Sequence, residues 1–258
     1  MALSDHLREL RARLIRSAAV VVVAFGVALF FYDELFELVL IPYNAAREAV
    51  GEEVVTKVVV NDITGPLLLQ LKLCGVTAVL VASPYWLYQI WAFIVPGLHE
   101  NERKWSRIFA AIAGPLFLAG VATCWYILPK AIEVLIGFVP GDPGEVENLV
   151  NFDKFFSFIA RMVFVFGISF EIPLFVVMLN LAGVVSGKTL GRYRPWIIIG
   201  TFVFAAVGTP STDPFSMLFL AIPMIILFGI AEVVSRLLDR RRGRTKASEL
   251  SDDEASAL

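Results

Sequence analysis

The sequence predicts an all-α, polytopic membrane protein with six transmembrane helices and both termini in the cytoplasm. Three observations predict this fold: an apolar composition, six apolar segments of helical length, and lysines and arginines gathered in alternate loops. Of the 258 residues, 58% are hydrophobic and 18% are charged, and the mean hydropathy is +0.75. Soluble domains are about 45–50% apolar and about 25% charged, so these values exclude a disordered chain and argue against an ordinary cytosolic enzyme.

Six apolar segments are long enough, or nearly so, to cross a hydrocarbon core of about 30 Å, which takes about 20 helical residues. They are too long for strands and show no period-two alternation. They run over residues 15–32, 67–94, 105–128, 155–181, 195–208 and 214–234. The fifth is only about 21 Å long as a helix, and a tight turn joins it to the sixth. We therefore expect the fifth and sixth helices to be short, with the bilayer thinned beside the fifth or incompletely crossed by it.

The loop charges orient these helices. Sixteen lysines and arginines lie at the N-terminus, in the second and fourth loops and in the tail, against three in the opposite loops, which places both termini in the cytoplasm. The basic start resembles a signal peptide, but its apolar stretch is too long and no small-residue cleavage site precedes Asp33, so we expect it to be retained. We assign residues 1–239 to one membrane domain. Residues 240–258, basic and then acidic, are expected to be a disordered cytoplasmic tail.

The N-terminal segment carries the first candidate residue for function, Glu9. Leucines at helical spacing in residues 3–14 make one apolar stripe, and Glu9 lies off it. The structural interpretation is an interfacial helix in which Glu9 and Arg13 form an i,i+4 pair. The functional interpretation is an acid that binds a ligand at the cytoplasmic surface.

The loop after the second segment holds two further acids, Glu100 and Glu102. The structural interpretation is that these acids are solvated and balance Arg103 and Lys104. Residues 99–103 begin like a zinc-binding H-E-x-x-H motif, but Arg103 stands where the second histidine is required, so we reject metal hydrolysis and expect neither metal nor cofactor.

The fourth and sixth segments contribute two more acids. Glu171 lies well inside the fourth segment, where a carboxylate costs about 2.5–3.5 kcal/mol on insertion scales and commonly has a function. Pro173 removes one backbone hydrogen bond and leaves the carbonyl of Ser169 free, which predicts a kink with a polar notch. Asp213 precedes Pro214, a pattern typical of a helix cap.

The loop over residues 33–66 is long, and its valines at 54–60 are compatible with either a short extended segment or packing on the membrane surface. Residues 142–144 are a turn signal in the next outer loop.

Several of these stretches, in order, resemble the TatC family, the membrane receptor of the twin-arginine protein translocation system. That family has six helices and cytoplasmic termini. The matching stretches are residues 6–14, 88–98 with 102–103, 166–173, 209–216 and 220–224.

The resemblance implies a signal-peptide site. Glu9 and Glu102 would bind the paired arginines of the signal peptide, Arg11 and Phe93 match family positions at or beside that site, and Glu100 shares the task as a further candidate. Carboxylates grip the planar guanidinium fork bidentately and cannot grip lysine in this way. Each charge-assisted hydrogen bond contributes about 1.5–3 kcal/mol.

The resemblance also implies structural and partner-binding positions. Pro42 would be the structural proline of the first outer loop. Glu171 would lie on the concave face, near where small single-helix partners, TatA and TatB, pack, and Asp213 matches an acid near the turn between the fifth and sixth helices. Two departures concern those partners.

The departures lie in the sixth segment. Met217 replaces a frequent glutamine, and Gly229 replaces a frequent acid. Glu232, three residues on, has nearly the same helical face as Gly229.

The sequence therefore favours a receptor and organising subunit of an oligomeric complex in the cytoplasmic membrane of a prokaryote. Folded cargo would be exported with the proton-motive force, without an enzymatic step or nucleic-acid partner, and no phosphate-binding loop is present. One alternative is a proton-coupled transporter of small solutes with Glu171 as proton carrier. Another is an intramembrane enzyme, for which Ser169 has no histidine at its depth.

Overall fold

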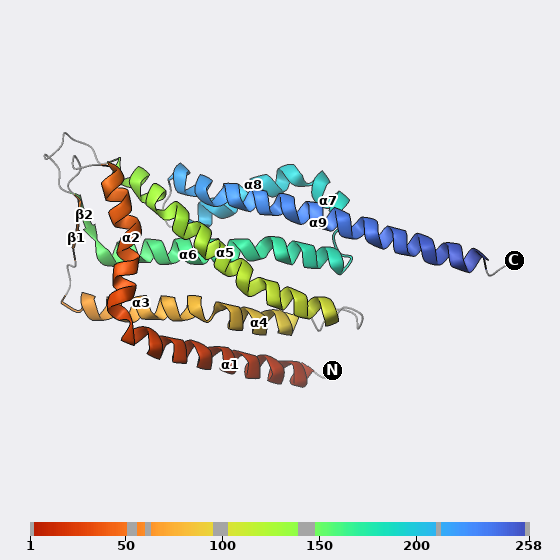
Figure 1. The fold of residues 1–258 in the computed structure, drawn as a ribbon, viewed down its shortest axis with the longest axis horizontal. Coiled ribbons are helices and arrows are strands. Elements are labelled where there is room, and N and C mark those ends of the chain that lie inside the picture. The colour runs from red at the N-terminus through yellow and green to blue at the C-terminus, as the bar shows by residue number, and fades with distance from the viewer. Residues whose placement is uncertain are drawn as a thin grey trace.

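A computed structural model gives the structure of the chain and describes residues 3–50, 56–59, 63–94, 103–138, 148–209 and 213–255. Long helices lie roughly side by side, and both termini lie at the same end of the molecule (Figure 1). We call this the terminal end and the other the far end. The elements are α1 (Leu3–Phe30), α2 (Tyr32–Val50), β1 (Thr56–Val59), α3 (Gly65–Val81), α4 (Ser83–Ile94), α5 (Arg103–Ile136), β2 (Asn148–Asn151), α6 (Phe152–Leu181), α7 (Gly187–Arg192), α8 (Arg194–Gly208) and α9 (Pro214–Ala255).

The predicted all-α membrane fold is confirmed. Among the described residues, four helices, α1, α5, α6 and α9, are each long and apolar enough to cross a membrane, and α3 and α4 together are as long and apolar, with a bend of 54° between them. The bend falls at Ala82, two residues before Pro84, which sits in the first turn of α4. The fifth predicted segment is α8, with 15 residues, so its predicted shortness is confirmed. The six-span count and the cytoplasmic side of the termini remain predictions.

One expectation about the last segment is wrong. The sixth helix, expected to be short, is α9 with 42 residues. The physical reason is composition, because residues 235–255 contain no proline and twelve of these 21 residues are arginine, leucine, alanine or glutamate, which are strong helix formers. The division of the chain into a membrane domain over residues 1–239 and a disordered tail stays a prediction.

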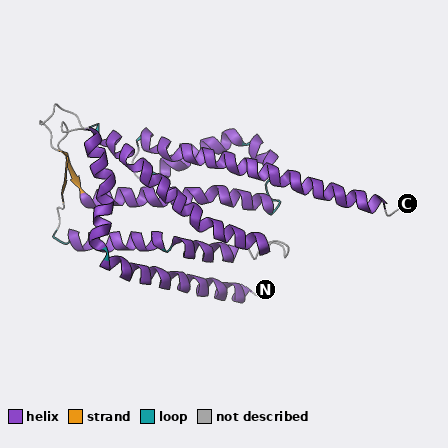
Figure 2. Cartoon of the chain, in the orientation of Figure 1, coloured by secondary structure: helices purple, strands orange, loops and turns teal. Residues whose placement is uncertain are grey.

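The loop expected over residues 33–66 is largely helical. α2 occupies its first part and crosses the far end of the bundle at a steep angle to the long helices (Figure 1). β1 fulfils the first of the two alternatives for the valines at 54–60, a short extended segment, and pairs in parallel with β2, in a register that joins Thr56 to Asn148 and Val59 to Asn151. Figure 2 shows these strands as a small patch at the far end of an otherwise helical chain. The expected turn at 142–144 lies outside the described residues.

Local signals explain where the later helices begin and end. The side chain of Asn151 caps α6 by accepting a hydrogen bond from the amide of Lys154, at 3.2 Å. Gly183, with φ of 75°, ends α6 in the left-handed conformation that glycine adopts without strain. Ser186 caps α7 in the same way as Asn151 caps α6, with an N–O distance of 3.1 Å to Thr189.

α5 and α6 form the centre of the bundle, and two glycines allow their close approach. A Cβ atom added at Gly120 would lie 2.7 Å from the carbonyl oxygen of Phe166, and one added at Gly167 would lie 2.5 Å from the ring of Phe117. Aromatic rings fill the space beside these glycines, and burial of such rings contributes strongly to stability. The largest fully buried side chains include Phe117, Phe152, Phe166, Leu73, Leu128, Met162 and Leu220. Both cysteines, Cys74 and Cys124, are buried and free.

Candidate functional site

Glu9 lies in the second turn of α1, at the terminal end, and its carboxylate is held by Arg13. Oε1 of Glu9 accepts hydrogen bonds from Nε of Arg13 at 3.0 Å and from Nη2 at 2.6 Å. The Glu9 and Arg13 side chains are 36% and 22% exposed. The predicted i,i+4 pair is therefore confirmed, and the acid remains open to solvent.

Arg13 also connects α1 to α4. Its Nη1 donates to Oε1 of Gln89 at 3.0 Å, and Gln89 is buried, with 7% exposure. Among the α1 side chains that the structure describes, residues 7–30, only Ala28 is buried. The contact between Arg13 and Gln89 is thus a specific attachment of an otherwise exposed helix.

The other residues of α1 and α4 agree with an interfacial position. Leu7 and Leu14 of the apolar stripe are 56% and 57% exposed, and Arg11 is exposed as well. Phe93 is half-buried and lies one helical turn after Gln89, on the same side of α4. The structure therefore brings Phe93 and Glu9 to neighbouring helices at the same end.

Glu100 and Glu102 lie outside the described residues. The helices that flank them are described: α4 ends at Ile94 and α5 begins at Arg103, directly after Glu102. Both helix ends lie at the terminal end, where α1 begins (Figure 1). A surface shared by Glu9 and Glu102 remains a prediction.

Glu171 lies in α6 and faces α4. The indole nitrogen Nε1 of Trp91 donates to Oε2 of Glu171 at 3.2 Å. The other oxygen, Oε1, is buried and has no hydrogen-bond partner among the described residues. The acid is therefore anchored on one side and has one oxygen available for a proton or for a donor from another chain.

The kink and polar notch expected at Pro173 stay predictions. α6 runs through Pro173 as one helix, and the proline is buried. The hydroxyl of Ser169 donates to the carbonyl oxygen of Val165, so it is committed to the backbone of its own helix. A nucleophile needs that hydroxyl free and beside a base, so this contact argues against an intramembrane hydrolase.

Asp213 caps α9 as the sequence predicts. Its Oδ1 accepts a hydrogen bond from the amide of Ser216 at 2.7 Å, and Pro214 is the first helical residue. Pro42, expected in an outer loop, lies inside α2 with its side chain buried. Its neighbour Tyr43 packs edge-on against Phe155, with ring centroids 5.4 Å apart, which fastens α2 to α6.

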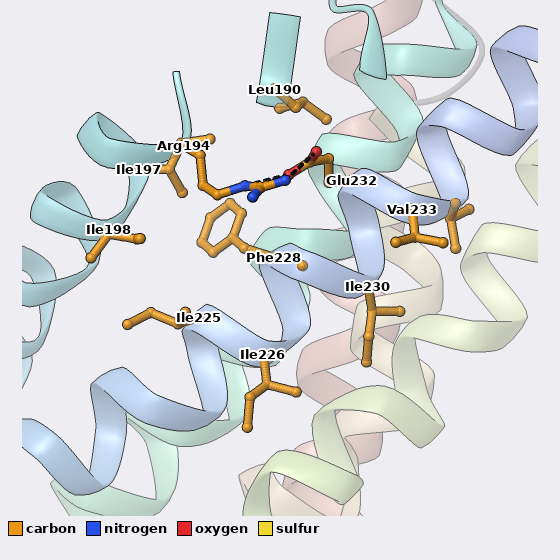
Figure 3. A pocket seen from close by; sticks show the side chains of 12 residues that line it. Leu190, Arg194, Ile197, Ile198, Ile225, Ile226, Phe228, Ile230, Glu232 and Val233 are labelled. Atoms are coloured by element: carbon orange, nitrogen blue, oxygen red, sulfur yellow. Dashed lines mark hydrogen bonds and ion pairs between the residues drawn. The ribbon is translucent and has the colours of Figure 1, made fainter. Parts of the chain in front are cut away.

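An apolar groove of about 580 Å³ separates α8 from α9. Apolar side chains, isoleucines above all, line most of it, and an ion pair lies at one end (Figure 3). Arg194 donates from Nε to Oε2 of Glu232 at 3.0 Å and from Nη2 to Oε1 at 2.8 Å, and Arg236 lies 2.7 Å from the same Oε1. Gly229 lines the groove, and a Cβ atom added there would meet nothing within 4 Å.

Sequence reasoning missed this ion pair, although a signal was present. Two apolar segments joined by a tight turn form an antiparallel hairpin, so the start of α8 lies beside the later part of α9. Arg194 and Glu232 occupy those positions and carry opposite charges. Arg194 and Arg236 both hold Glu232, so its carboxylate is paired within this chain.

Two grooves among the described residues, the one above and a second, are mainly apolar. The second, about 520 Å³, lies among α2, α3, α5 and α6 and is lined almost wholly by apolar side chains. Neither groove is lined by Glu171. A proton-coupled solute carrier needs a polar cavity around such an acid.

Comparison with known proteins decides the family. The model of the family described as Sec-independent protein translocase protein (TatC) matches residues 5–223. The chain belongs to the TatC family. TatC proteins of Corynebacterium kroppenstedtii and Frankia casuarinae are 37% and 39% identical to it; each alignment covers all of this chain, with 67% and 73% of the relative.

Solved structures agree with this TatC assignment. A crystal structure of the twin-arginine translocase receptor TatC in the detergent DDM superposes with a TM-score of 0.73 at 29% identity, covering 89% of this chain and 99% of that one. A second TatC crystal structure gives 0.71 at 30% identity, covering 90% and 98%. This TatC family member is thus a multi-pass protein of the bacterial cytoplasmic membrane.

Proposed function

We propose that this chain is the receptor subunit of a twin-arginine translocase, and that it binds the paired arginines of signal peptides where α1 begins and α4 ends. Its membership of a protein translocase family assigns it to transport rather than catalysis, in a complex with other Tat subunits. The observation that carries the proposal is the half-exposed carboxylate of Glu9, which already holds a guanidinium group in this structure.

The chemistry of that contact fits arginine in particular. A guanidinium group presents several N–H donors in one plane, and a carboxylate accepts two of them in parallel. Lysine offers a point charge on a flexible stem and cannot make the same fork. An acid that is 36% exposed and already holds one guanidinium through Oε1 therefore favours an arginine-rich ligand.

Glu9 would act with Glu102, one acid for each arginine, and Glu100 is a further candidate. Arg11 and Phe93 would flank the site, Phe93 offering an aromatic face against which a guanidinium can stack. The surrounding charge supports the assignment, because the residues around these acids at the terminal end are mostly arginine and lysine. The two arginines of a signal peptide would therefore meet few other carboxylates at this end.

The chain would also organise single-helix partners, TatA and TatB, through its membrane-facing surfaces. Glu171, with its buried and unpartnered oxygen, and Asp213 at the turn between α8 and α9 would contact them. Met217 and Gly229 would make the partner contacts of this chain less polar than is frequent in the family. Folded cargo would then leave the cytoplasm at the expense of the proton-motive force.

The proposal is tested by photo-crosslinking of labelled signal peptides to this chain in native membrane vesicles. An Arg-Arg peptide should crosslink efficiently near residues 9 and 93, and the matched Lys-Lys peptide should crosslink at least about tenfold less, since the two forks contribute charge-assisted hydrogen bonds of about 1.5–3 kcal/mol each. Equal crosslinking of both peptides, or uptake of small solutes by the purified chain alone, would contradict the receptor function.

A further inference from the structure

We propose that Arg13 and Gln89 are positioning residues: together they hold the carboxylate of Glu9 in register with the end of α4, and thereby set the preference of the site for arginine over lysine. This inference rests on the proposed function of Glu9. Arg13 and Gln89 would not touch the signal peptide themselves. They would act through Glu9.

Arg13 fixes the rotation of the Glu9 carboxylate. Nε and Nη2 both donate to Oε1, at 3.0 and 2.6 Å, so Oε2 is the oxygen that a second donor would meet. A rigid guanidinium plane defines the direction of that oxygen, whereas a single ammonium contact would let the carboxylate turn.

Gln89 fixes Arg13 in turn. Its amide oxygen accepts from Nη1 at 3.0 Å, and its burial, with 7% exposure, restricts the amide to few orientations. The guanidinium therefore bridges two helices, with two nitrogens on the acid of α1 and the third on the amide of α4. Lysine at position 13 could reach one of these acceptors and would break the bridge.

The bridge sets the register between the two predicted halves of the site. Glu9 precedes Arg13 by about 6 Å along α1, and Gln89 precedes the end of α4 at Ile94 by about 8 Å. The chain leaves α4 there and reaches Glu102 directly before α5. Adjacent arginines of a ligand have a fixed spacing, and sites of this kind lose selectivity when their groups move by about 0.5 Å.

A different function for Arg13 predicts the opposite result. If Arg13 merely competed with the signal peptide for Glu9, its removal would strengthen binding of both the Arg-Arg and the Lys-Lys peptide. If it merely stabilised the fold, its removal would lower the amount of inserted protein and leave the ratio of the two peptides unchanged. Only a positioning function predicts that removal of Arg13 lowers the ratio of Arg-Arg to Lys-Lys peptide binding.

The experiment measures crosslinking of photo-reactive Arg-Arg and Lys-Lys signal peptides to the full chain in vesicles that contain the complete translocase. Arg13→Lys and Gln89→Leu should each lower the Arg-Arg to Lys-Lys ratio by about threefold or more, because a charge-assisted fork is lost or loosened. The double variant should fall no further than the lower single variant, since both residues act through one bridge. Gln89→Glu, which keeps the acceptor, should retain the ratio.

Arg16→Lys is the matched control, because Arg16 is exposed one turn further along the same helix, and it should leave the ratio unchanged. An unchanged ratio in both Arg13→Lys and Gln89→Leu, or stronger binding of both peptides, would overturn the inference. If Gln89→Leu does not insert, Arg13→Lys alone decides. Unchanged Arg-Arg crosslinking in Glu9→Gln would instead refute the proposed function of Glu9, so the two failures are distinguishable.

Discussion

Arg194 at the start of α8 holds the carboxylate of Glu232 on α9 through two parallel hydrogen bonds, 3.0 and 2.8 Å long (Figure 3). The Glu232 side chain is only 9% exposed, and Arg236 contacts it as well. Glu232→Ala would leave two arginines facing each other without the acid between them. We expect the unfolding temperature of the detergent-solubilised protein to fall by several degrees, measured by thermal unfolding monitored by size-exclusion chromatography. Arg194→Lys, which keeps the charge and loses the fork, should have a smaller effect, and an unfolding temperature unchanged in Glu232→Ala would contradict this expectation.

Gly167→Ala should destabilise the crossing of α5 and α6. The new methyl group would lie 2.5 Å from the ring of Phe117, so the helices must separate or the ring must move, at a cost of about 1–3 kcal/mol. Gly75→Ala is the control, because its Cβ atom would meet nothing within 4 Å. This substitution should stabilise α3 slightly, since alanine favours a helix over glycine. Similar unfolding temperatures for the two variants would show that the contact is easily relieved.

Glu9→Ala and Glu102→Ala should each weaken crosslinking to an Arg-Arg signal peptide, by about tenfold for the loss of roughly 1.5 kcal/mol. Both variants should still insert; the Glu9 side chain is partly exposed on α1 and contributes no core packing. Glu34→Ala is the matched control, an exposed acid of α2 at the far end. Undiminished crosslinking in both variants would refute the assigned functions of the two acids.

Glu171→Ala should alter assembly with the single-helix partners, because it removes the one unpartnered carboxylate oxygen buried near the contact of α4 and α6. Blue-native electrophoresis of membranes should show a changed complex size. Trp91→Phe removes only the indole donor to Glu171 and leaves the carboxylate in place. Comparing the two variants shows whether assembly depends on the carboxylate itself or on its hydrogen bond to Trp91. Complexes of wild-type size in Glu171→Ala would count against a partner-binding function.

Asp213→Ala should cost about 0.5–2 kcal/mol of stability, because the first turn of α9 loses its side-chain cap. Asp213→Asn keeps an oxygen that can accept from the amide of Ser216 and should retain most of that stability. If Asp213 contacts partners through its charge, Asp213→Asn will fold normally and still assemble poorly, as measured by thermal unfolding and native electrophoresis in parallel. Equal stability of the alanine and asparagine variants would contradict the capping function.

Local sequence patterns predicted what depends on neighbours along the chain. The length of the apolar runs located α1, α5, α6 and α8, and one run covered α3 and α4 together. The contact between Glu9 and Arg13 was predictable because residues four apart on a helix are adjacent. The cap by Asp213 was predictable for the same reason.

Contacts between distant residues were not predictable. Gln89 is 76 residues from Arg13, and nothing in either segment alone indicates that an amide of α4 meets a guanidinium of α1. α2 was taken for a loop because its acids, Asp33 and Glu34, interrupt any long apolar run. Its buried side, with Tyr43 and Ala46, becomes evident only against α5 and α6.

The pairing of β1 with β2 has a mechanical consequence. β1 lies in the connection from α2 to α3, and β2 lies in the connection from α5 to α6. The hydrogen bonds between β1 and β2 join these two connections, so a displacement of one connection is resisted by the other. The ion pair of Lys72 with Asp153, 2.6 Å apart, adds a second brace between α3 and α6. With the far end braced in this way, an outward swing of α3 would pivot there and displace α4, which follows it and carries Gln89, by the greater amount.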